Sequence, residues 1–221
     1  LFAMPETGIG LFPDVGATYF LPRCPGRMGL YMGLSGARIG VADALYLGLA
    51  THHVASARIA ELEAALAAAD LSDSAASAID AVLRDFSSDL EDAPLAAHQA
   101  EVDRCFAADS VEGIFANLAA EGTPWAEETR ATLLEKSPTS LKITFRQLTQ
   151  YGDLDFEAAM KVEYRMAIRC NFSHEFYEGI RAQIIDKDRQ PKWVPGRLED
   201  VGEDLIESYF QPPASGDMTF G

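Results

Sequence analysis

The sequence has few cysteines, few basic residues and no long apolar run. Its three cysteines, Cys24, Cys105 and Cys170, lie far apart without paired spacing. This spacing argues against a disulfide framework or a zinc site and fits a reducing compartment. The 18 Lys and Arg residues face 34 Asp and Glu residues, a net charge of −16. Such a charge disfavours nucleic acid or an anionic membrane as a partner, and no apolar stretch is long enough for a membrane span.

Motifs for several kinds of catalysis are also missing. No Ser or Cys stands in a Gly-x-Ser-x-Gly pattern, which marks a nucleophile elbow. The histidines form no cluster: His52 and His53 are adjacent and therefore point in different directions, while His98 and His174 lie in helical patterns and are expected at the surface. We therefore expect neither a metal nor a bound nucleotide cofactor.

No targeting segment is recognisable in the first residues. The chain opens at Leu1 inside an apolar run, without a signal peptide or an Arg- and Ser-rich transit segment. From this and the alanine-rich composition we expect a location in a bacterial cytoplasm rather than a mitochondrial matrix.

What the chain does have is a pair of carboxylates in its apolar, glycine-punctuated opening, residues 1–16. Four prolines and glycines between positions 5 and 13 prevent one continuous helix, so only a folded-back loop can bring Glu6 and Asp14 together. A carboxyl held near apolar surface has a raised pKa, and a neighbouring carboxylate raises it further. Such environments commonly prepare an acid, a base or a nucleophile.

A purely structural interpretation of the same acids stays open at this point. Asp14 can cap a short helix beginning at Val15, because Asp is a preferred N-cap residue. Glu6 follows Pro5 and can occupy a solvated first helical turn, where the helix dipole favours an acid.

The remaining pattern is mostly helical. We expect three segments: 1–54, an α/β part with a strand at its start and a short strand at 51–55; 55–136, a helical insertion; and 137–221, C-terminal helices and a tail. The expected helices cover residues 27–34, 41–47, 57–69, 74–86, 95–107, 111–120, 124–136, 137–151, 156–169 and 174–182. Ser137, followed by Pro138, is a strong N-cap signal for one of them.

Two groups of motifs, far apart in the chain, are shared with one enzyme family. The first group is Met4-Pro5-Glu6-Thr7, Gly10-Leu11-Phe12-Pro13-Asp14-Val15-Gly16, Tyr19-Phe20-Leu21-Pro22-Arg23, Leu34-Ser35-Gly36-Ala37-Arg38-Ile39-Gly40 and residues 42–52. The second is Glu178-Gly179-Ile180-Arg181-Ala182 and residues 185–193. With them the chain resembles the crotonase (enoyl-CoA hydratase/isomerase) superfamily, specifically its 3-hydroxyisobutyryl-CoA hydrolase branch.

The resemblance implies roles for particular residues. Hydratases of the superfamily are similar at Pro5 and Glu6 but usually have glycine where Asp14 stands here. In the hydrolase branch the two acids are the catalytic pair, which implies catalytic roles for Glu6 and Asp14. Substrate contacts are implied for Pro5, Gly10 and Phe12. A carboxylate at position 14 should obstruct the water position of a hydratase, which favours thioester hydrolysis.

The resemblance also implies a fold and a reaction. The fold class is α/β: the C-terminal part of a crotonase-like ββα spiral core, followed by a mostly helical C-terminal region. Family members have a substantial N-terminal portion before this point, with the oxyanion amides and much of the acyl-CoA cleft, so we expect this chain to be inactive without it. The implied reaction is hydrolysis of 3-hydroxyisobutyryl-CoA in valine breakdown, with CoA only as part of the substrate, and homo-oligomers are implied as well.

Other interpretations remain open at the level of sequence. The chain can belong to an enoyl-CoA hydratase or isomerase, or it can be a non-catalytic assembly module. For a hydrolase, Glu6 can either attack the thioester or activate water. The charged run from Asp186 to Arg189 can be a solvated loop or a contact for CoA.

Overall fold

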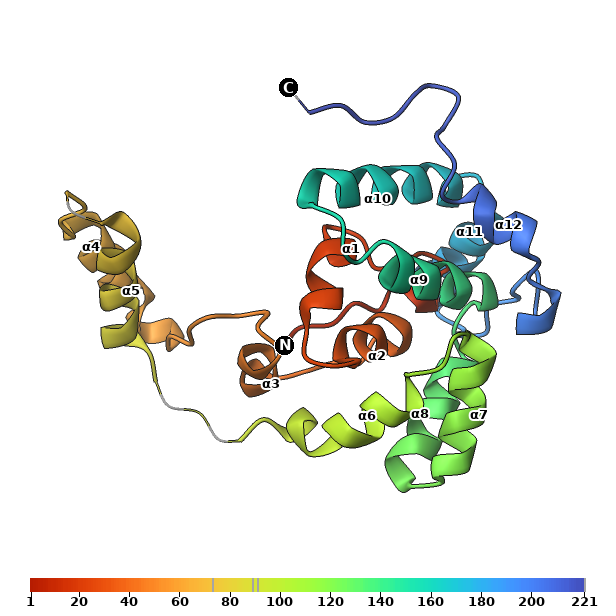
Figure 1. Cartoon of the computed structure of the whole chain (residues 1–221), viewed down its shortest axis with the longest axis horizontal. Coiled ribbons are helices and arrows are strands. Elements are labelled where there is room, and N and C mark those ends of the chain that lie inside the picture. Colours follow the sequence, from red (N-terminus) through yellow and green to blue (C-terminus); the bar gives the residue numbers. More distant parts are fainter. Residues whose placement is uncertain (73, 89, 91, 221) are drawn as a thin grey trace. The chain divides into compact units, whose positions relative to one another are not determined.

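The computed structural model describes residues 1–72, 74–88, 90 and 92–220, which are almost all helical or irregular (Figure 1). The chain divides into two units: unit 1 contains residues 1–2 and 39–97, and unit 2 contains residues 3–38 together with everything from residue 98 onward. This grouping differs from the three expected segments, because the helix at 28–35 packs against the helix at 138–150 although about a hundred residues separate them. Sequence order alone does not reveal such a pairing.

Unit 1 is a small helical unit. Its elements are α3 (Val41–Tyr46), η3 (Ser56–Arg58), α4 (Ile59–Ala68), α5 (Ala75–Phe86) and η4 (Pro94–His98). Helices α4 and α5 pack side by side, and the Arg58 guanidinium lies 4.2 Å from the centre of the Phe86 ring. The buried carboxylate of Asp43 accepts the N–H of Leu95 at 2.8 Å and so ties α3 to η4.

The two strands expected in the first 55 residues are reduced to single bridges. Phe2 pairs with Ile39, and Val54 pairs with Ser87, both antiparallel and both isolated in the part of the chain that the structure describes. A strand needs a partner along several successive residues, and here each segment meets its partner at only one. The expectation of a short strand over 51–55 is therefore wrong.

Unit 2 holds the larger core. Its elements are η1 (Glu6–Ile9), α1 (Ala17–Phe20), η2 (Leu21–Arg23), α2 (Met28–Ser35), α6 (Gln99–Cys105), α7 (Val111–Glu121), α8 (Pro124–Leu134), α9 (Pro138–Gln150), α10 (Phe156–Cys170), α11 (His174–Ile180), the π-helical η5 (Arg181–Ile185), η6 (Leu198–Asp200) and α12 (Glu203–Ser208). One buried cluster joins Phe12 to α9, α10 and α12 through Ile143, Met166 and Ile206, among others. The core thus connects the opening segment to helices more than 130 residues away.

Local sequence signals account for these helices. The expected helices are confirmed to within a few residues, except that the helix expected over 95–107 is divided into the 3-10 helix η4 and the shorter α6. Ser137 caps α9 as expected, because its hydroxyl accepts the N–H of Ser140 at 3.2 Å and Pro138 occupies the first turn. Asp155 caps α10 in the same way, with its carboxylate 2.8 Å from the N–H of Ala158.

Two further features of the described residues bear on the exclusions made from sequence. The three cysteines are free and buried, and burial raises the pKa of the Cys24 thiol to about 11, which leaves it a poor nucleophile. None of the described helices combines the length and the hydropathy that a bilayer span requires.

Candidate active site

A tight turn carries the first of the two acids. Glu6 opens the 3-10 helix η1, in which the N–H of Gly8 bonds the carbonyl of Pro5 and the N–H of Leu11 bonds the carbonyl of Glu6, both at 3.0 Å. Gly10 ends the turn with a φ of 72°, in the left-handed region that favours glycine. The chain therefore folds back after Glu6, as the opening motif predicts.

Two glycines hold this turn against α11. A Cβ on Gly10 would lie 2.2 Å from the carbonyl oxygen of Glu175, and a Cβ on Gly179 would lie 2.3 Å from the backbone of Ile9. Backbones approach this closely only where side chains are absent. One motif of the first group, residues 10–16, thus meets one motif of the second, residues 178–182, at the base of the turn. This packing accounts for Gly10, whose predicted substrate contact stays a prediction.

Glu6 occupies an environment that disfavours its charged form. The side chain is half-buried, and its Oε2 is buried with no hydrogen-bond partner in the described structure. Burial raises the pKa of Glu6 from 4.5 to about 7; a backbone N–H opposes the rise and the negative charge of Asp14 adds to it. This is not the solvated helix start that the alternative interpretation requires. At neutral pH the group can exist as a carboxylate or as an acid.

Asp14 lies on the loop between η1 and α1, close enough for its charge to act on Glu6. Its carboxyl is half-buried, and burial raises its pKa as well. The residue is not a side-chain cap: Gly16 occupies the N-cap of α1, and Asp14 contributes only its carbonyl oxygen, 3.0 Å from the N–H of Ala17. The capping interpretation of Asp14 is therefore wrong, and the negative charge of Asp14 contributes to the raised pKa of Glu6.

The loop after Asp14 has an unusual backbone. Val15 has a φ of 52°, which is rare for a β-branched residue, and Gly16 has a φ of 94°. The Val15 side chain is 74% exposed, so its own packing does not fix this conformation. The restraint must come from neighbouring elements.

Two buried side chains, which the sequence analysis did not single out, supply that restraint. Glu163 of α10 accepts the N–H of Gly16 at 2.8 Å and that of Thr18 at 2.9 Å. Gln147 of α9 donates to the carbonyl of Pro13 at 2.7 Å and to the Thr18 hydroxyl at 2.8 Å. A signal for Glu163 exists in the sequence, since it stands next to Val162 on a helix face that also carries apolar residues.

Two more charged residues lie against η1 and α11. The Lys136 amine lies 3.8 Å from the place that a Cβ would occupy if Gly8 had one, so it is close to this turn. Burial lowers the pKa of this amine. The buried Glu175 carboxyl accepts the Ser137 hydroxyl and, at 2.7 Å, the N–H of Val194. Burial raises the pKa of Glu175, and its partners indicate a structural role.

The other two predicted substrate contacts lie in different surroundings. Pro5 is exposed directly before η1. Phe12 is fully buried in the core of unit 2, among residues of α9, α10 and α12. Packing explains why an aromatic residue stands at position 12, and both substrate contacts stay predictions.

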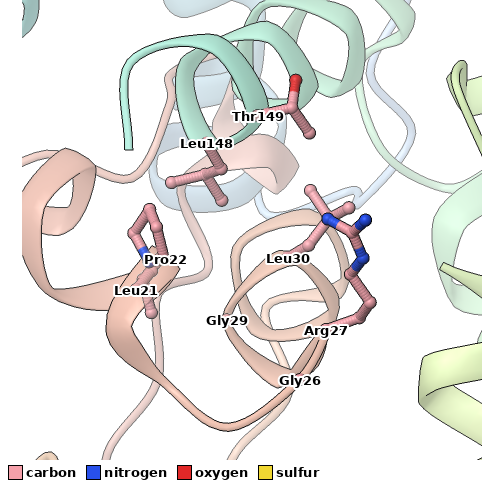
Figure 2. Close-up of a pocket in the computed structure, with 8 residues that line it drawn as sticks. All are labelled: Leu21, Pro22, Gly26, Arg27, Gly29, Leu30, Leu148 and Thr149. Carbon is pink, nitrogen blue, oxygen red and sulfur yellow. The ribbon is translucent and has the colours of Figure 1, made fainter. Parts of the chain in front are cut away.

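One cavity of unit 2 lies between η2, the start of α2 and the end of α9 (Figure 2). In Figure 2, Leu148 and Thr149 of α9 face Pro22 and Leu30, with Arg27 at the side. Its volume is about 60 Å³, well below the several hundred Å³ of a typical ligand pocket. Neither Glu6 nor Asp14 lines it, so it is not the site of the two acids.

The charged run at 186–189 is held from within the chain. The Arg181 guanidinium binds the carboxylates of Asp186 at 2.8 Å and Asp188 at 2.6 Å, together with Glu178. Lys187 and Arg189 remain exposed. The acidic half of the run therefore has a structural explanation, and a CoA contact of the basic half stays a prediction.

The histidines remain scattered in the described structure. His98 is partly exposed, as expected, and it also has partners: its ring stacks on that of Trp125, with 5.5 Å between the ring centres, and its Nδ1 lies 2.7 Å from a carboxylate oxygen of Glu101. Over the described ranges, no group of three or more His, Cys, Asp and Glu side chains could hold a metal ion.

A family model and the relatives described next point to the same family. The family model described as "Enoyl-CoA hydratase/isomerase" matches residues 1–210. The chain is 44% identical over 222 residues to the mitochondrial 3-hydroxyisobutyryl-CoA hydrolase of Xenopus tropicalis, covering 99% of this chain and 57% of that protein. It is 40% identical over 225 residues to the human protein of the same name, covering 100% of this chain and 58% of that protein. The chain thus spans less than two thirds of these relatives.

Solved structures agree on the fold. The crystal structure of a carnitinyl-CoA dehydratase from Mycobacterium thermoresistibile matches with a TM-score of 0.85 and 36% identity, over 97% of this chain and 60% of that one. An enoyl-CoA hydratase from Rhodobacter sphaeroides 2.4.1 matches with a TM-score of 0.84 and 38% identity, over 98% and 60%. The expected fold, the largely helical C-terminal part of a crotonase-like core, is confirmed.

One expectation is corrected by these relatives. The hydrolases of Xenopus tropicalis and human are both named as mitochondrial proteins. The location in a bacterial cytoplasm expected from the sequence is therefore wrong, because the features used for it, an alanine-rich composition and no recognisable leader, do not discriminate between the two.

Proposed function

The chain belongs to the enoyl-CoA hydratase/isomerase family, and we propose that it forms part of a 3-hydroxyisobutyryl-CoA hydrolase, which releases 3-hydroxyisobutyrate and CoA in valine breakdown. The two relatives of that name described above are 44% and 40% identical to it. One observation carries the proposal: Glu6, its pKa raised to about 7, lies within reach of the charge of Asp14. A hydrolase needs such a group, which can exist as a carboxylate at neutral pH in a partly dehydrated site.

In the proposed mechanism the ionised Glu6 acts on the thioester carbonyl. It either attacks the carbonyl carbon, so that CoA leaves as a thiolate that takes up a proton from water and a mixed anhydride remains for water to cleave, or removes a proton from water that attacks the same carbon, and this proton then passes to the departing CoA thiolate. Asp14 binds the substrate hydroxyl and helps to place the water or the leaving group. Oxygen-18 from labelled water enters the Glu6 side chain in a single turnover only by the anhydride route.

The oxyanion amides complete the proposed mechanism. Backbone N–H groups that stabilise the developing oxyanion lower the barrier of acyl transfer substantially. By the family resemblance they belong to the N-terminal portion of the fold. The proposed activity is therefore that of the whole protein, of which this chain supplies the two acids.

A hydratase is the second candidate, because the solved structures above are named as a carnitinyl-CoA dehydratase and an enoyl-CoA hydratase. An assay of the full-length protein separates the two. We expect rapid release of free thiol from 3-hydroxyisobutyryl-CoA, measured with a thiol reagent, and little loss of the conjugated double bond of crotonyl-CoA, measured by its ultraviolet absorbance. Fast hydration without thiol release would reject the hydrolase.

The proposed function also has a pH dependence. The reaction needs Glu6 as a carboxylate, and its pKa is raised to about 7. We therefore expect kcat/KM for thiol release to rise tenfold per pH unit below about pH 7 and to level off above it. A plateau that extends down to pH 5 would show that Glu6 titrates like an ordinary glutamate and would contradict its raised pKa.

A further inference from the structure

The loop that carries Asp14 is held from two sides by buried side chains of unit 2. Glu163 is 3% exposed and Gln147 is fully buried. Glu163 and Thr18 are separated by 145 positions, so the contact depends entirely on the tertiary fold. Gln147 donates to the carbonyl of Pro13, the residue before Asp14, and Glu163 accepts the N–H of Gly16, two residues after it.

The chemistry of this contact suits a carboxylate in particular. The two N–H groups of Gly16 and Thr18 point at the two different oxygens of Glu163. A carboxylate offers only acceptors, whereas the amide of a glutamine would turn a donor toward one of these N–H groups. Hydrogen bonds from N–H groups to a charged acceptor are also stronger than those to a neutral one.

Glu163 is itself held rigidly. Its neighbours on α10, including Val162 and Met166, are part of the buried core cluster. Burying a carboxyl costs free energy unless its partners compensate, and the two N–H partners of Glu163 lie at the end of the Asp14 loop, at Gly16, and in the first turn of α1, at Thr18. Together with the local backbone bonds, Glu163 and Gln147 hold the backbone on both sides of Val15, whose positive φ its own exposed side chain does not fix.

We propose that Glu163, with Gln147, is a positioning residue that sets the direction in which Asp14 faces Glu6. The inference rests on the proposed function, because it concerns the second acid of that site. Glu163 acts through the backbone of the loop and has no contact with the substrate in this proposal.

The test compares Glu163→Gln with the wild type in the full-length protein. We expect kcat for thiol release to fall about tenfold to a hundredfold, with KM within about threefold, because misplacing a reacting group by about 1 Å can cost as much. Asp43→Asn is the matched control: it too replaces a buried carboxylate that accepts a backbone N–H, but in unit 1. It should leave kcat unchanged.

A second readout does not depend on activity. The carboxyl signal of Glu6 is titrated by ¹³C NMR and assigned with Glu6→Gln. Lys136 and Glu175, the other charged groups against η1 and α11, are unaltered in these variants. If Asp14 turns away in Glu163→Gln, the pKa of Glu6 should fall as it does in Asp14→Asn, because the same negative charge is lost from its surroundings.

The outcomes separate this inference from the proposed function. A wild type without thiol release rejects the function, and the Glu6 titration then decides the inference alone. The inference is overturned if Glu163→Gln folds and the pKa of its Glu6 equals that of the wild type. It is also overturned if the wild type is active and Glu163→Gln folds and has the same kcat. If Glu163→Gln does not fold, as judged by circular dichroism, Gln147→Met is judged by the same criteria. If neither folds, the contacts serve folding, and the positioning role is rejected.

Discussion

Replacing Glu6 by glutamine is expected to lower thiol release from 3-hydroxyisobutyryl-CoA by about a thousandfold or more in the full-length protein. Glutamine has nearly the same shape as glutamate but neither attacks a carbonyl nor takes a proton from water. The measurement is kcat from single-turnover and steady-state assays above pH 8, where wild-type Glu6, with its pKa of about 7, is ionised. Retention of more than about a tenth of the wild-type rate would remove Glu6 from the mechanism.

The same substitution should not destabilise the protein, which separates a catalytic effect from a folding effect. The pKa of Glu6 is raised from 4.5 to about 7 by burial. The native state therefore binds this proton more tightly than the unfolded state does, and stability falls as pH rises from about 4.5 through 7. Above pH 7 the Tm of Glu6→Gln is expected to equal or exceed that of the wild type. Glu63→Gln, which removes the same charge at an exposed position on α4, is the control and should leave Tm unchanged.

Replacing Asp14 by asparagine is expected to lower kcat for thiol release by about a hundredfold, in the range found when a positioned carboxylate is lost. It should also move the acid limb of the pH profile to lower pH. The charge of Asp14 contributes to the raised pKa of Glu6, so without it Glu6 ionises more easily. Both effects are read from one series of kcat/KM values between pH 5 and pH 9.

The two effects of Asp14→Asn test different statements. An unchanged rate would show that Asp14 does not take part in hydrolysis. A reduced rate with an unmoved acid limb would show that the two carboxyls do not interact. Asp85→Asn, an exposed acid of α5, removes the same charge elsewhere and should change neither the rate nor the limb.

The helices of this protein were predictable because their signals are local. Apolar spacing and N-cap residues lie within one or two turns of each helix, as with Ser137 for α9 and Asp155 for α10. The strands were not predictable in the same way, since Val54 finds a single partner in Ser87. Strand formation depends on a partner that the local sequence does not contain.

The sequence predicted which residues form the candidate site, but it did not predict how they are arranged. The turns demanded by the prolines and glycines of residues 5–13 indicated that Glu6 and Asp14 could meet. The same reasoning left open whether Asp14 caps a helix. The structure excludes this, because Gly16 is the N-cap residue of α1 and no side chain makes a capping hydrogen bond there. Phe12, named as a substrate contact, lies in the core, since an apolar motif residue can serve packing equally well.

The amino-acid sequence by itself determined the family resemblance, the helices and the pair of acids, because these depend on residue identity and on spacing over a few positions. The tertiary structure alone decided how buried Glu6 is, which glycines let the turn dock on α11, and that Glu163 and Gln147 grip the Asp14 loop. The glycine contacts and the hydrogen bonds of Glu163 and Gln147 join residues more than a hundred positions apart, and only the packing of the helices brings these residues together.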